Sequence, residues 1–249
     1  MGIKKLILGD CFDRIKNIQD NSIDLLFVDP PYKKTNLGWD ESFDLSIFNE
    51  FRMVINKSGV IVVFGREPLL SYHRITLIDL FKYDYIWKKN RKNGYVLANT
   101  RPLQETEKIA VFSKGSMKPS SCTMSYFPQF TRPCHKKFIK GKLKPKYISS
   151  GFNGGMSSGR KEYPTDIIEC DQEWKPFHPT EKPLELFEYL VLTYSKIGDT
   201  VLDCCFGSGN SIIAAKNLHR NFIGIEKDKE YFNRLTNLIC TSCSENKTT

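Results

Sequence analysis

Short apolar runs, each the length of a single strand, alternate along this chain with stretches of helical spacing. The runs Ile23–Val28 and Val60–Phe64 are almost wholly apolar, as in parallel strands whose two faces are both covered. The same alternation returns towards the C-terminal end, after a central segment without periodicity. Alternating strands and helices predict an α/β fold with a doubly wound, mostly parallel sheet.

The expected elements cover most of the chain outside that central segment. Further strands are expected at Lys5–Leu8, Tyr83–Trp87, Lys108–Phe112, Thr200–Asp203 and Phe222–Glu226. Helices are expected at Cys11–Ile18, Phe43–Ile55, Leu69–Phe81, Pro183–Tyr194, Ser211–Leu218 and Lys229–Ile239. Gly59 is expected to break the second of these helices before the next strand begins.

Length and composition favour a packed globular protein. A chain of 249 residues fits one large domain, or one domain with an insertion, and 40% hydrophobic residues support a core. No apolar run approaches the roughly 20 residues that span a bilayer. Met1–Lys5 leads into a run too short for a signal peptide. We therefore expect a cytoplasmic protein without a membrane partner.

The cysteines point to the same compartment. Eight cysteines are scattered without a framework spacing, which is typical of a reducing environment. Cys240 and Cys243 form a single CxxC pair, whereas a structural zinc site needs four ligands. We expect no metal site.

All of the excess positive charge lies in one internal segment. The chain has a net charge of +9, yet residues 108–161 hold 12 Lys or Arg and no Asp or Glu. The remaining residues have 25 basic and 28 acidic side chains, a net charge of −3. A solvated basic face is one interpretation. The complete absence of acids over this length favours a surface that binds a polyanion.

A glycine turn between two strands suggests a nucleotide-type cofactor site. The strand ending at Asp203 runs into Phe206–Gly209, a helix follows, and the next strand ends at Glu226, 19 positions after Gly207. Glycines let the backbone approach a ligand, and an acid there can bind both ribose hydroxyls. The pattern lacks the GxGxxG spacing of a pyrophosphate site, so it suits a ligand with ribose and no phosphate. A tight turn with an ordinary strand-end Glu is the alternative.

A second motif, Asp29-Pro30-Pro31-Tyr32, follows the strand Ile23–Val28. The carboxyl end of such a strand lies where ligands bind in open α/β sheets. A carboxylate and a backbone carbonyl that accept both hydrogens of an exocyclic amine would make its nitrogen more nucleophilic. Prolines fix the direction of the carbonyl and have no N–H to donate, and an aromatic ring can stack on a flipped base. A solvent-exposed turn capped by Asp29 is the alternative.

Together these motifs resemble the DNA amino-methyltransferases, specifically their permuted β class. In that class the catalytic motif comes first, the target-recognition region second and the cofactor loop last. Here the order is Asp29–Tyr32, the basic segment, His178–Pro183, then Phe206–Gly209. The resemblance implies a Rossmann-like methyltransferase fold and S-adenosyl-L-methionine as cofactor. It also implies site-specific methylation of adenine N6 in double-stranded DNA by base flipping, in a restriction–modification context.

The resemblance also implies roles for matched residues. Asp29 and the Pro30 carbonyl would hold the target amine, and Tyr32 would stack on the flipped base. Asp10 would accept a hydrogen bond from the cofactor's adenine, Glu226 would bind its ribose, and Thr180 and Lys182 would lie beside its methionine end. The catalytic candidates are Asp29, Pro30, Pro31 and Tyr32. The cofactor candidates are Asp10, Cys11, Asp29, Thr180, Lys182, Asp203, Phe206, Gly207, Ser208, Gly209, Asn210 and Glu226.

Several positions depart from the family pattern. Cys204 and Cys205 stand where Pro and Phe are usual before the Gly-Ser-Gly turn, and Asn210 and Ser211 replace a common Thr-Thr. Lys33 follows the catalytic Tyr in place of Asn. These changes leave the chemistry intact and bear on cofactor affinity.

The expected division is a catalytic and cofactor-binding domain of residues 1–113 and 178–249, interrupted by a target-recognition insert of residues 114–177. Phosphate contacts of the insert would give affinity rather than sequence choice. The DNA-binding candidates are Arg132, His135, Lys136, Lys137, Lys140, Lys142, Lys144, Lys146 and Arg160. Base-reading candidates are Gln129, Arg132, Asn153 and Arg160.

Other readings stay open from the sequence. The target could be cytosine N4, or RNA could replace DNA. A catalytically inactive DNA-binding subunit is a further alternative, prompted by the altered cofactor loop. The resemblance also suggests a cognate restriction endonuclease as partner and a homodimer as the assembly.

Overall fold

The computed structural model describes residues 2–30, 44–129, 163–172 and 181–244. The chain divides into two compact units, residues 1–127 with 166–249 and residues 128–165. The first unit holds every strand and helix given below. No helix in the described ranges is long and apolar enough to cross a membrane.

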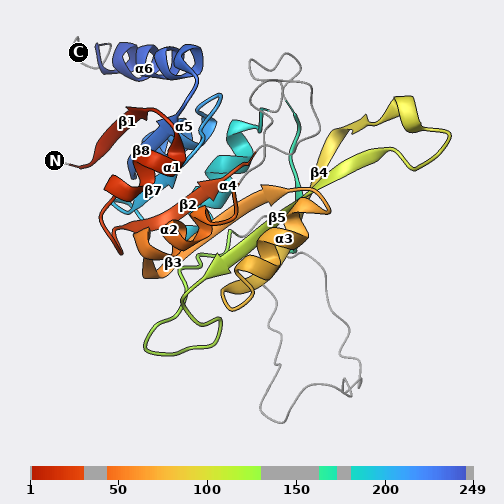
Figure 1. The fold of residues 1–249 in the computed structure, drawn as a ribbon, viewed down its shortest axis with the longest axis horizontal. Helices are drawn as coiled ribbons and strands as arrows, with labels where there is room; N and C mark the ends of the chain where they lie inside the picture. Colours follow the sequence, from red (N-terminus) through yellow and green to blue (C-terminus); the bar gives the residue numbers. More distant parts are fainter. Residues whose placement is uncertain (1, 31–43, 130–162, 173–180, 245–249) are drawn as a thin grey trace, which may run out of the picture. The chain divides into compact units, whose positions relative to one another are not determined.

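One mixed eight-stranded sheet forms the centre of the first unit, in the order β1-β8-β7-β2-β3-β5-β4-β6 (Figure 1). Its strands are β1 (Lys4–Leu8), β2 (Ile23–Val28), β3 (Ile55–Gly65), β4 (Phe81–Asn93), β5 (Gln104–Ser113), β6 (Ile167–Glu169), β7 (Thr200–Asp203) and β8 (Asn221–Glu226). Only the pairs that involve β5 are antiparallel among the described strands. The expected mostly parallel, doubly wound sheet is confirmed.

Helices cover both faces of the sheet. They are α1 (Cys11–Arg14), α2 (Ile47–Val54), α3 (Leu69–Thr76), α4 (Leu184–Tyr194), α5 (Asn210–Asn217) and α6 (Lys229–Ser244), with short 3-10 turns η1 (Ile15–Asn17) and η2 (Tyr95–Leu97). Side chains of a strand alternate between the two faces. Phe27 of β2 therefore packs in one core cluster with Phe187 of α4, whereas Leu26 packs in the other with Phe51 of α2.

Some boundaries differ from the sequence prediction. Gly59 does not separate a helix from a strand, because α2 ends at Val54 and β3 begins at Ile55. The pairing of β3 with β2 slips between Ile55 and Val60, so Gly59 lies inside an irregular part of one long strand. Likewise α3 ends at Thr76, since the chain turns there to enter β4.

The ends of the predicted insert pack against the sheet. Met124, Ile168 and Cys170 are buried in the core, and the N–H of Phe127 donates to the carbonyl of Thr193 at 2.7 Å. The indole of Trp87 donates to the carbonyl of Cys170 at 2.9 Å. The separate compact unit, residues 128–165, lies within the predicted insert of residues 114–177.

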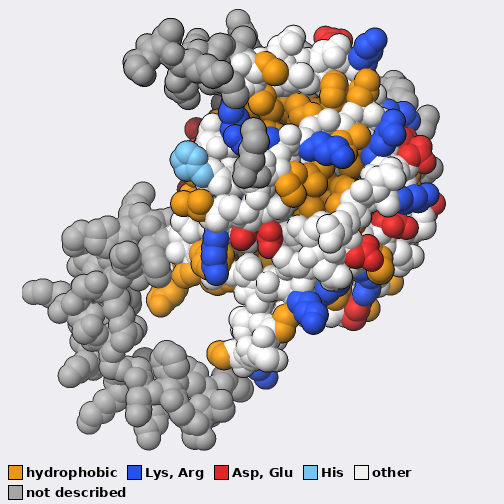
Figure 2. Space-filling view, turned by 90° about the vertical axis from the view of Figure 1, so that its left-hand side faces the viewer, with side chains coloured by type: hydrophobic (Ala, Val, Ile, Leu, Met, Phe, Trp, Pro, Cys, Tyr) orange, Lys and Arg blue, Asp and Glu red, His pale blue; other side chains and the backbone are white. Residues whose placement is uncertain are grey.

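The C-terminal CxxC motif begins in α6, where Cys240 is exposed. The described part of the chain contains no cluster of His, Cys, Asp and Glu suited to a metal ion. Figure 2 shows basic and acidic side chains interspersed over one face of the described residues, as expected from their near-balanced charge.

Candidate active site

Four acidic side chains lie at the carboxyl ends of four adjacent parallel strands. Asp10 follows β1, Glu226 ends β8, Asp203 ends β7 and Asp29 follows β2. The chain leaves β7 towards β8 and leaves β2 towards β3, so strand order reverses between β7 and β2. Open α/β sheets bind their ligands at such a switch point. The pairing of Phe27 with Asp203 brings the two predicted motifs together there.

The loop after β7 is organised by Asp203. Its carboxylate accepts the N–H of Cys205 at 3.0 Å and the hydroxyl of Ser211, from the first turn of α5. Burial raises the pKa of Asp203 to about 7, against the lowering effect of these two donors. The neighbouring charges of Asp29 and Glu226 raise that pKa further. Asp203 therefore titrates near neutral pH.

The predicted glycine turn follows at residues 206–209. Gly207 and Gly209 both have positive φ, 50° and 86°, which L side chains rarely adopt. A Cβ on Gly209 would also lie 2.6 Å from Leu235, so this position excludes other residues on two grounds. Ser208 lies in the same turn, and the ring of Phe206 is buried against Phe232 at 6.4 Å between centroids. The turn opens directly into α5.

Glu226 faces this turn from the end of β8. Its carboxylate accepts the N–H groups of Gly207 and Asp228, each at 2.8 Å. Burial raises the pKa of Glu226, while the backbone donors, including that of Lys227, lower it. A carboxylate offers about four acceptor sites, so Glu226 retains capacity to accept a ligand hydroxyl. A carboxylate with spare acceptor capacity beside a glycine turn fits the hydroxyl groups of a ribose.

Asp10 lies beside Glu226 because Leu8 pairs with Glu226 across β1 and β8. Its carboxylate accepts the N–H of Phe12 at 3.0 Å as the N-cap of α1. The ammonium of Lys227 lies 3.3 Å from its other oxygen. Cys11 follows and is buried beneath the loop, where its thiol and that of Cys205 raise the pKa of Cys204.

The two cysteines that depart from the family pattern connect the cofactor loop to β2. The thiol of Cys205 donates to the carbonyl of Asp29 at 3.3 Å, and the thiol of Cys204 donates to the carbonyl of Phe27 at 3.7 Å. The two sulfur atoms are 3.8 Å apart. These thiols therefore help to fix the backbone that carries the catalytic motif.

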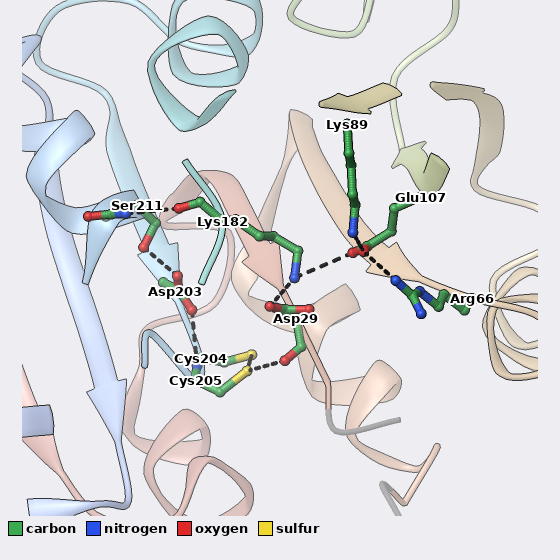
Figure 3. Close-up of polar contacts among 10 residues, drawn as sticks. Asp29, Arg66, Lys89, Glu107, Lys182, Asp203, Cys204, Cys205 and Ser211 are labelled. Carbon is green, nitrogen blue, oxygen red and sulfur yellow. Dashed lines mark hydrogen bonds and ion pairs between the residues drawn. The ribbon is translucent and has the colours of Figure 1, made fainter. Parts of the chain in front are cut away.

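At the catalytic end, Asp29 forms an ion pair with Lys182 (Figure 3). The same ammonium lies 3.5 Å from Glu107 of β5, whose other oxygen pairs with Lys89 of β4 at 2.6 Å. Arg66 approaches that oxygen at 3.7 Å. Opposite charges thus alternate from Asp29 through Lys182 and Glu107 to Lys89, and we call these four residues the charge ladder.

Lys182, Glu107 and Lys89 of the charge ladder are almost wholly removed from solvent, whereas the side chain of Asp29 is 25% exposed. Lys182 is 4% exposed and Glu107 5%. Burial alone would raise the pKa of Glu107, but the ammonium groups of Lys182 and Lys89 outweigh it and hold that pKa at about 2. Burial opposes the charge of Lys182 as well, yet Asp29 and Glu107 raise its pKa. Burial dominates for Lys89, and lowers its pKa.

Aromatic faces complete the surroundings of the two lysines. The ammonium of Lys182 lies 4.8 Å from the ring centroid of Phe64, and that of Lys89 lies 4.5 Å from the ring of Trp87. Both are cation–π distances. Asn210 of α5 fixes the backbone of Lys182 by donating to its carbonyl at 2.8 Å, and to the carboxylate of Glu181 at 3.0 Å.

The structure brings most of the described candidates to one edge of the sheet: Asp10, Cys11, Asp29, Pro30, Lys182, Asp203, Phe206, Gly207, Ser208, Gly209, Asn210 and Glu226. Pro31, Tyr32 and Thr180 lie outside the described residues, as do the DNA-binding candidates Arg132, His135, Lys136, Lys137, Lys140, Lys142, Lys144, Lys146 and Arg160.

Sequence reasoning missed Glu107 and Lys89. Glu107 stands two positions before Ile109, at the start of the apolar strand residues Ile109–Phe112, and Lys89 follows Trp87 at the spacing of one strand face. A charged residue in phase with a buried face is a signal of a paired interior charge. The partner could not be read from the sequence, because Lys182 is 75 positions away from Glu107.

The profile of the N6/N4 methyltransferase family, described as DNA methylase, matches residues 23–237. This chain belongs to that DNA methylase family. Type II methyltransferase M.HinfI of Haemophilus influenzae is 27% identical over 92% of this DNA methylase, which spans 66% of that relative. M1.MboII of Moraxella bovis is 26% identical, with 93% of this chain and 95% of the relative covered.

Solved structures agree with the fold of this DNA methylase. The complex of M1.HpyAVI with SAM matches with a TM-score of 0.62 and 26% identity, covering 92% of this chain and 96% of that one. The cytosine-N4-specific PvuII DNA methyltransferase matches with a TM-score of 0.62 and 17% identity, covering 91% and 83%. At 17% identity, the similarity to the PvuII enzyme shows the fold alone.

Proposed function

We propose that this DNA methylase transfers a methyl group from S-adenosyl-L-methionine to N6 of adenine in double-stranded DNA. The observation that carries the proposal is the position of Asp29. Its carboxylate stands at the switch point of the sheet, on the strand next to the one that opens into the glycine turn. The motif Asp29-Pro30-Pro31-Tyr32 favours adenine as the target base, since Ser is commoner than Asp at the first position of this motif in cytosine-N4 enzymes.

The cofactor supplies an electrophilic methyl group on a positively charged sulfur. The side chains at the carboxyl edge would orient it. Glu226 would accept the ribose hydroxyls, Asp10 would accept the adenine amine, and residues 206–209 would let the backbone approach. Thr180 and Lys182 would lie near the methionine end. The buried carboxylate of Glu226, with acceptor capacity beyond its backbone donors, supports the ribose role.

Asp29 would act on the substrate amine. Its carboxylate and the Pro30 carbonyl accept the two hydrogens of N6, so the nitrogen lone pair is drawn out of the ring and towards the methyl carbon. When bound, the cofactor would supply the methyl carbon, and its sulfur would keep the electron pair of the broken carbon–sulfur bond as the nitrogen–carbon bond forms. The nitrogen then loses one proton along its hydrogen bond to Asp29 and on to water. Positioning supplies most of the rate in such a transfer.

Lys182 sets the charge of this centre. Without it, the carboxylates of Asp29 and Glu107 would stand close together in a dry site, where like charges repel strongly. The ammonium lies between them and interacts with both. Lys182 therefore positions Asp29 as well as lying beside the expected cofactor site.

Cytosine N4 is a second candidate target. A cytosine-N4-specific enzyme shares the fold with the same TM-score as the M1.HpyAVI complex. The exocyclic amine of cytosine would need the same two acceptors. A catalytically inactive DNA-binding subunit is a third candidate. The ordered Cys204–Cys205 loop argues against it, because these thiols hold Asp29 in place.

The wider assignments extend this proposal. The permuted β-class arrangement rests on the motif order, and the insert of residues 114–177 would carry target recognition. Type II methyltransferases among the relatives suggest a restriction–modification context with a cognate endonuclease. A homodimer is proposed by the family resemblance, and sedimentation of the purified chain would test it.

The deciding experiment is methyl transfer from labelled S-adenosylmethionine to unmethylated duplex DNA, followed by digestion and mass identification of the nucleosides. We expect N6-methyladenine. N4-methylcytosine would overturn the base assignment and keep the reaction. DNA binding without transfer, together with no cofactor binding in calorimetry, would favour the inactive subunit. Transfer to RNA alone would replace the substrate.

A further inference from the structure

The β4–β5 hairpin extends beyond the carboxyl edge of the sheet. β4 and β5 are antiparallel, and β5 is antiparallel to β3, so β4 runs parallel to β3 and ends at the edge that holds Asp29. Gly65, the last residue of β3, pairs with Lys108, whereas β4 continues to Asn93. Six residues past Trp87 correspond to about 20 Å of extended strand. Figure 1 shows this hairpin in yellow, projecting from the sheet.

Basic side chains outnumber acidic ones in the projecting part of the hairpin, where Glu105 is the acid on the returning strand β5. Residues 85–104 contain five Lys or Arg and no Asp or Glu. The two basic residues nearest the sheet are already paired, Lys88 with Glu169 and Lys89 with Glu107. The excess positive charge of the hairpin therefore lies in its outer part, where Lys92 is exposed. This basic segment is separate from the one at residues 108–161.

The tip of the hairpin exposes three consecutive apolar side chains. Tyr95 is 66% exposed, Val96 98% and Leu97 46%. Their backbone is nonetheless ordered: Gly94 turns the chain with φ of 93°, and the N–H of Leu97 donates to its carbonyl at 2.9 Å. The N–H of Arg101 closes the turn on the carbonyl of Leu97 at 3.0 Å. An ordered turn that holds apolar side chains in water is suited to a binding contact.

We propose that this hairpin is an arm that clasps duplex DNA beside the flipped base, with Tyr95, Val96 and Leu97 as a wedge between bases. The inference rests on the proposed function for its partner. Apolar side chains inserted at a base step unstack it and stabilise a distorted duplex, and removing a base from the stack requires such unstacking. The basic flank supplies phosphate contacts.

Duplex DNA fits this surface better than a second protein copy does. Lysine is depleted in protein–protein interfaces, whereas residues 85–104 of the hairpin combine apolar and basic side chains without acids. Lys89 also connects the base of the arm to the charge ladder, so the arm starts at the catalytic centre and reaches outward. Its length, about 20 Å, matches the scale of a duplex lying across that edge.

The test compares hairpin variants with matched controls at the opposite edge of the sheet. The tip variant combines Tyr95→Ser, Val96→Ser and Leu97→Ser, and the charge variant is Lys92→Gln. The controls are Ile197→Ser, an exposed apolar residue before β7, and Lys57→Gln, an exposed lysine near the start of β3. All four change exposed side chains, so thermal unfolding should match the wild type and verify folding.

Binding is measured with two labelled 30-base-pair duplexes of mixed sequence, one intact and one with a central abasic site. We expect the wild type to prefer the abasic duplex, because its unstacked step admits the wedge. The tip variant should lose this preference and bind intact duplex about 10-fold more weakly, in line with the loss of base contacts. Lys92→Gln should lower the slope of log affinity against log salt by about 1. The controls should match the wild type.

Unchanged affinity, preference and salt slope in the hairpin variants would overturn the inference. So would a wild-type dimer in sedimentation without DNA that the tip variant converts to monomer, because the tip would then bind a second copy. These results are distinct from failure of the proposed function. If the wild type methylates DNA but the hairpin variants bind DNA as it does, the DNA-binding arm is rejected and the methyl transfer is kept. If the hairpin variants bind DNA more weakly but the wild type methylates nothing, the methyl transfer is rejected and the arm is kept. Absence of any DNA binding rejects both.

Discussion

The two ends of the carboxyl edge hold their carboxylates in opposite ways. At the catalytic end, Glu107 and Asp29 are balanced by the buried ammonium groups of Lys89 and Lys182. At the cofactor end, Asp203 is held by one backbone N–H and the hydroxyl of Ser211. Burial is severe at both ends, but the pKa of Glu107 falls to about 2 and that of Asp203 rises to about 7.

The difference shows what each kind of partner can do. A full opposite charge outweighs desolvation and keeps an interior carboxylate ionised at any physiological pH, whereas neutral hydrogen-bond donors offset only part of it. The catalytic end therefore has a fixed charge. The cofactor end has a carboxylate whose protonation changes near neutral pH. The contribution of Glu107 to stability is lost as pH falls, whereas that of Asp203 is lost as pH rises.

The strongest test of this comparison is Glu107→Gln. The change keeps the shape but leaves the buried ammonium of Lys89 without its counter-charge and that of Lys182 paired with Asp29 alone. This should lower the free energy of unfolding by about 3–5 kcal/mol. Urea unfolding at pH 7 measures the loss. The lowered pKa of Glu107 gives stability that is fully present above about pH 4.5 and is lost as pH falls towards 2. This acid-sensitive part should vanish in the variant.

Glu169→Gln is the matched control, because it breaks the exposed pair with Lys88 on the same hairpin. Exposed pairs contribute little to stability, so the control should stay near the wild type. Equal losses in the two variants would contradict the assignment of Glu107 as the counter-charge of the ladder.

Asp29→Ala tests the catalytic end by rate. We expect turnover to fall at least ~100-fold, as when one well-placed polar partner of a reaction is removed. Cofactor binding should persist, since the glycine turn and Glu226 are unchanged. Single-turnover methyl transfer and calorimetry separate the two effects. Near-wild-type turnover would remove Asp29 from its proposed role.

The sequence predicted the strand-end positions of this site better than the ion pairs that connect its residues. Strand-end positions such as Asp29 and Glu226 follow from local patterns, because a parallel sheet places all carboxyl ends at one edge. These features depend on residues close together in the chain.

The charge ladder could not be predicted in the same way. Glu107 and Lys89 lie on consecutive strands, 18 positions apart, but Lys182 is 75 positions from Glu107, and no local pattern shows which of these charges pair. The burial of Met124 and Ile168, near the two ends of the predicted insert, was also beyond sequence reasoning, because both residues lie in mostly polar stretches. The burial of Ile168 depends on the pairing of β6 with β4, which local composition does not encode.

Asp203→Asn tests the cofactor end through stability. Between about pH 4 and pH 7 the folded chain keeps a proton on Asp203 that the unfolded chain has lost, so wild-type stability falls as pH rises through that window. The amide can accept from Cys205 and donate to Ser211 without a charge. The free energy of unfolding of the variant should exceed that of the wild type by about 2 kcal/mol at pH 8. This is below the upper limit of roughly 1.4 kcal/mol for each unit by which the pKa of Asp203 is raised. The advantage should disappear below pH 4, as measured by urea unfolding, and a pH-independent difference would contradict the raised pKa.

Ser211→Ala should have the smallest effect on the free energy of unfolding, and the direction of that effect follows from one hydrogen bond. The hydroxyl of Ser211 lowers the pKa of Asp203, so its removal should move that pKa further above 7. Hydrogen bonds to charged groups are worth more than those to neutral ones. The variant should therefore lose about 1 kcal/mol more at pH 8 than at pH 5, where Asp203 is protonated in the folded chain. In the Asp203→Asn background this pH dependence should vanish, because no charge remains for the hydroxyl to stabilise. A loss that is equal at both pH values, or that survives in that background, would mean that Ser211 packs the turn instead of tuning Asp203.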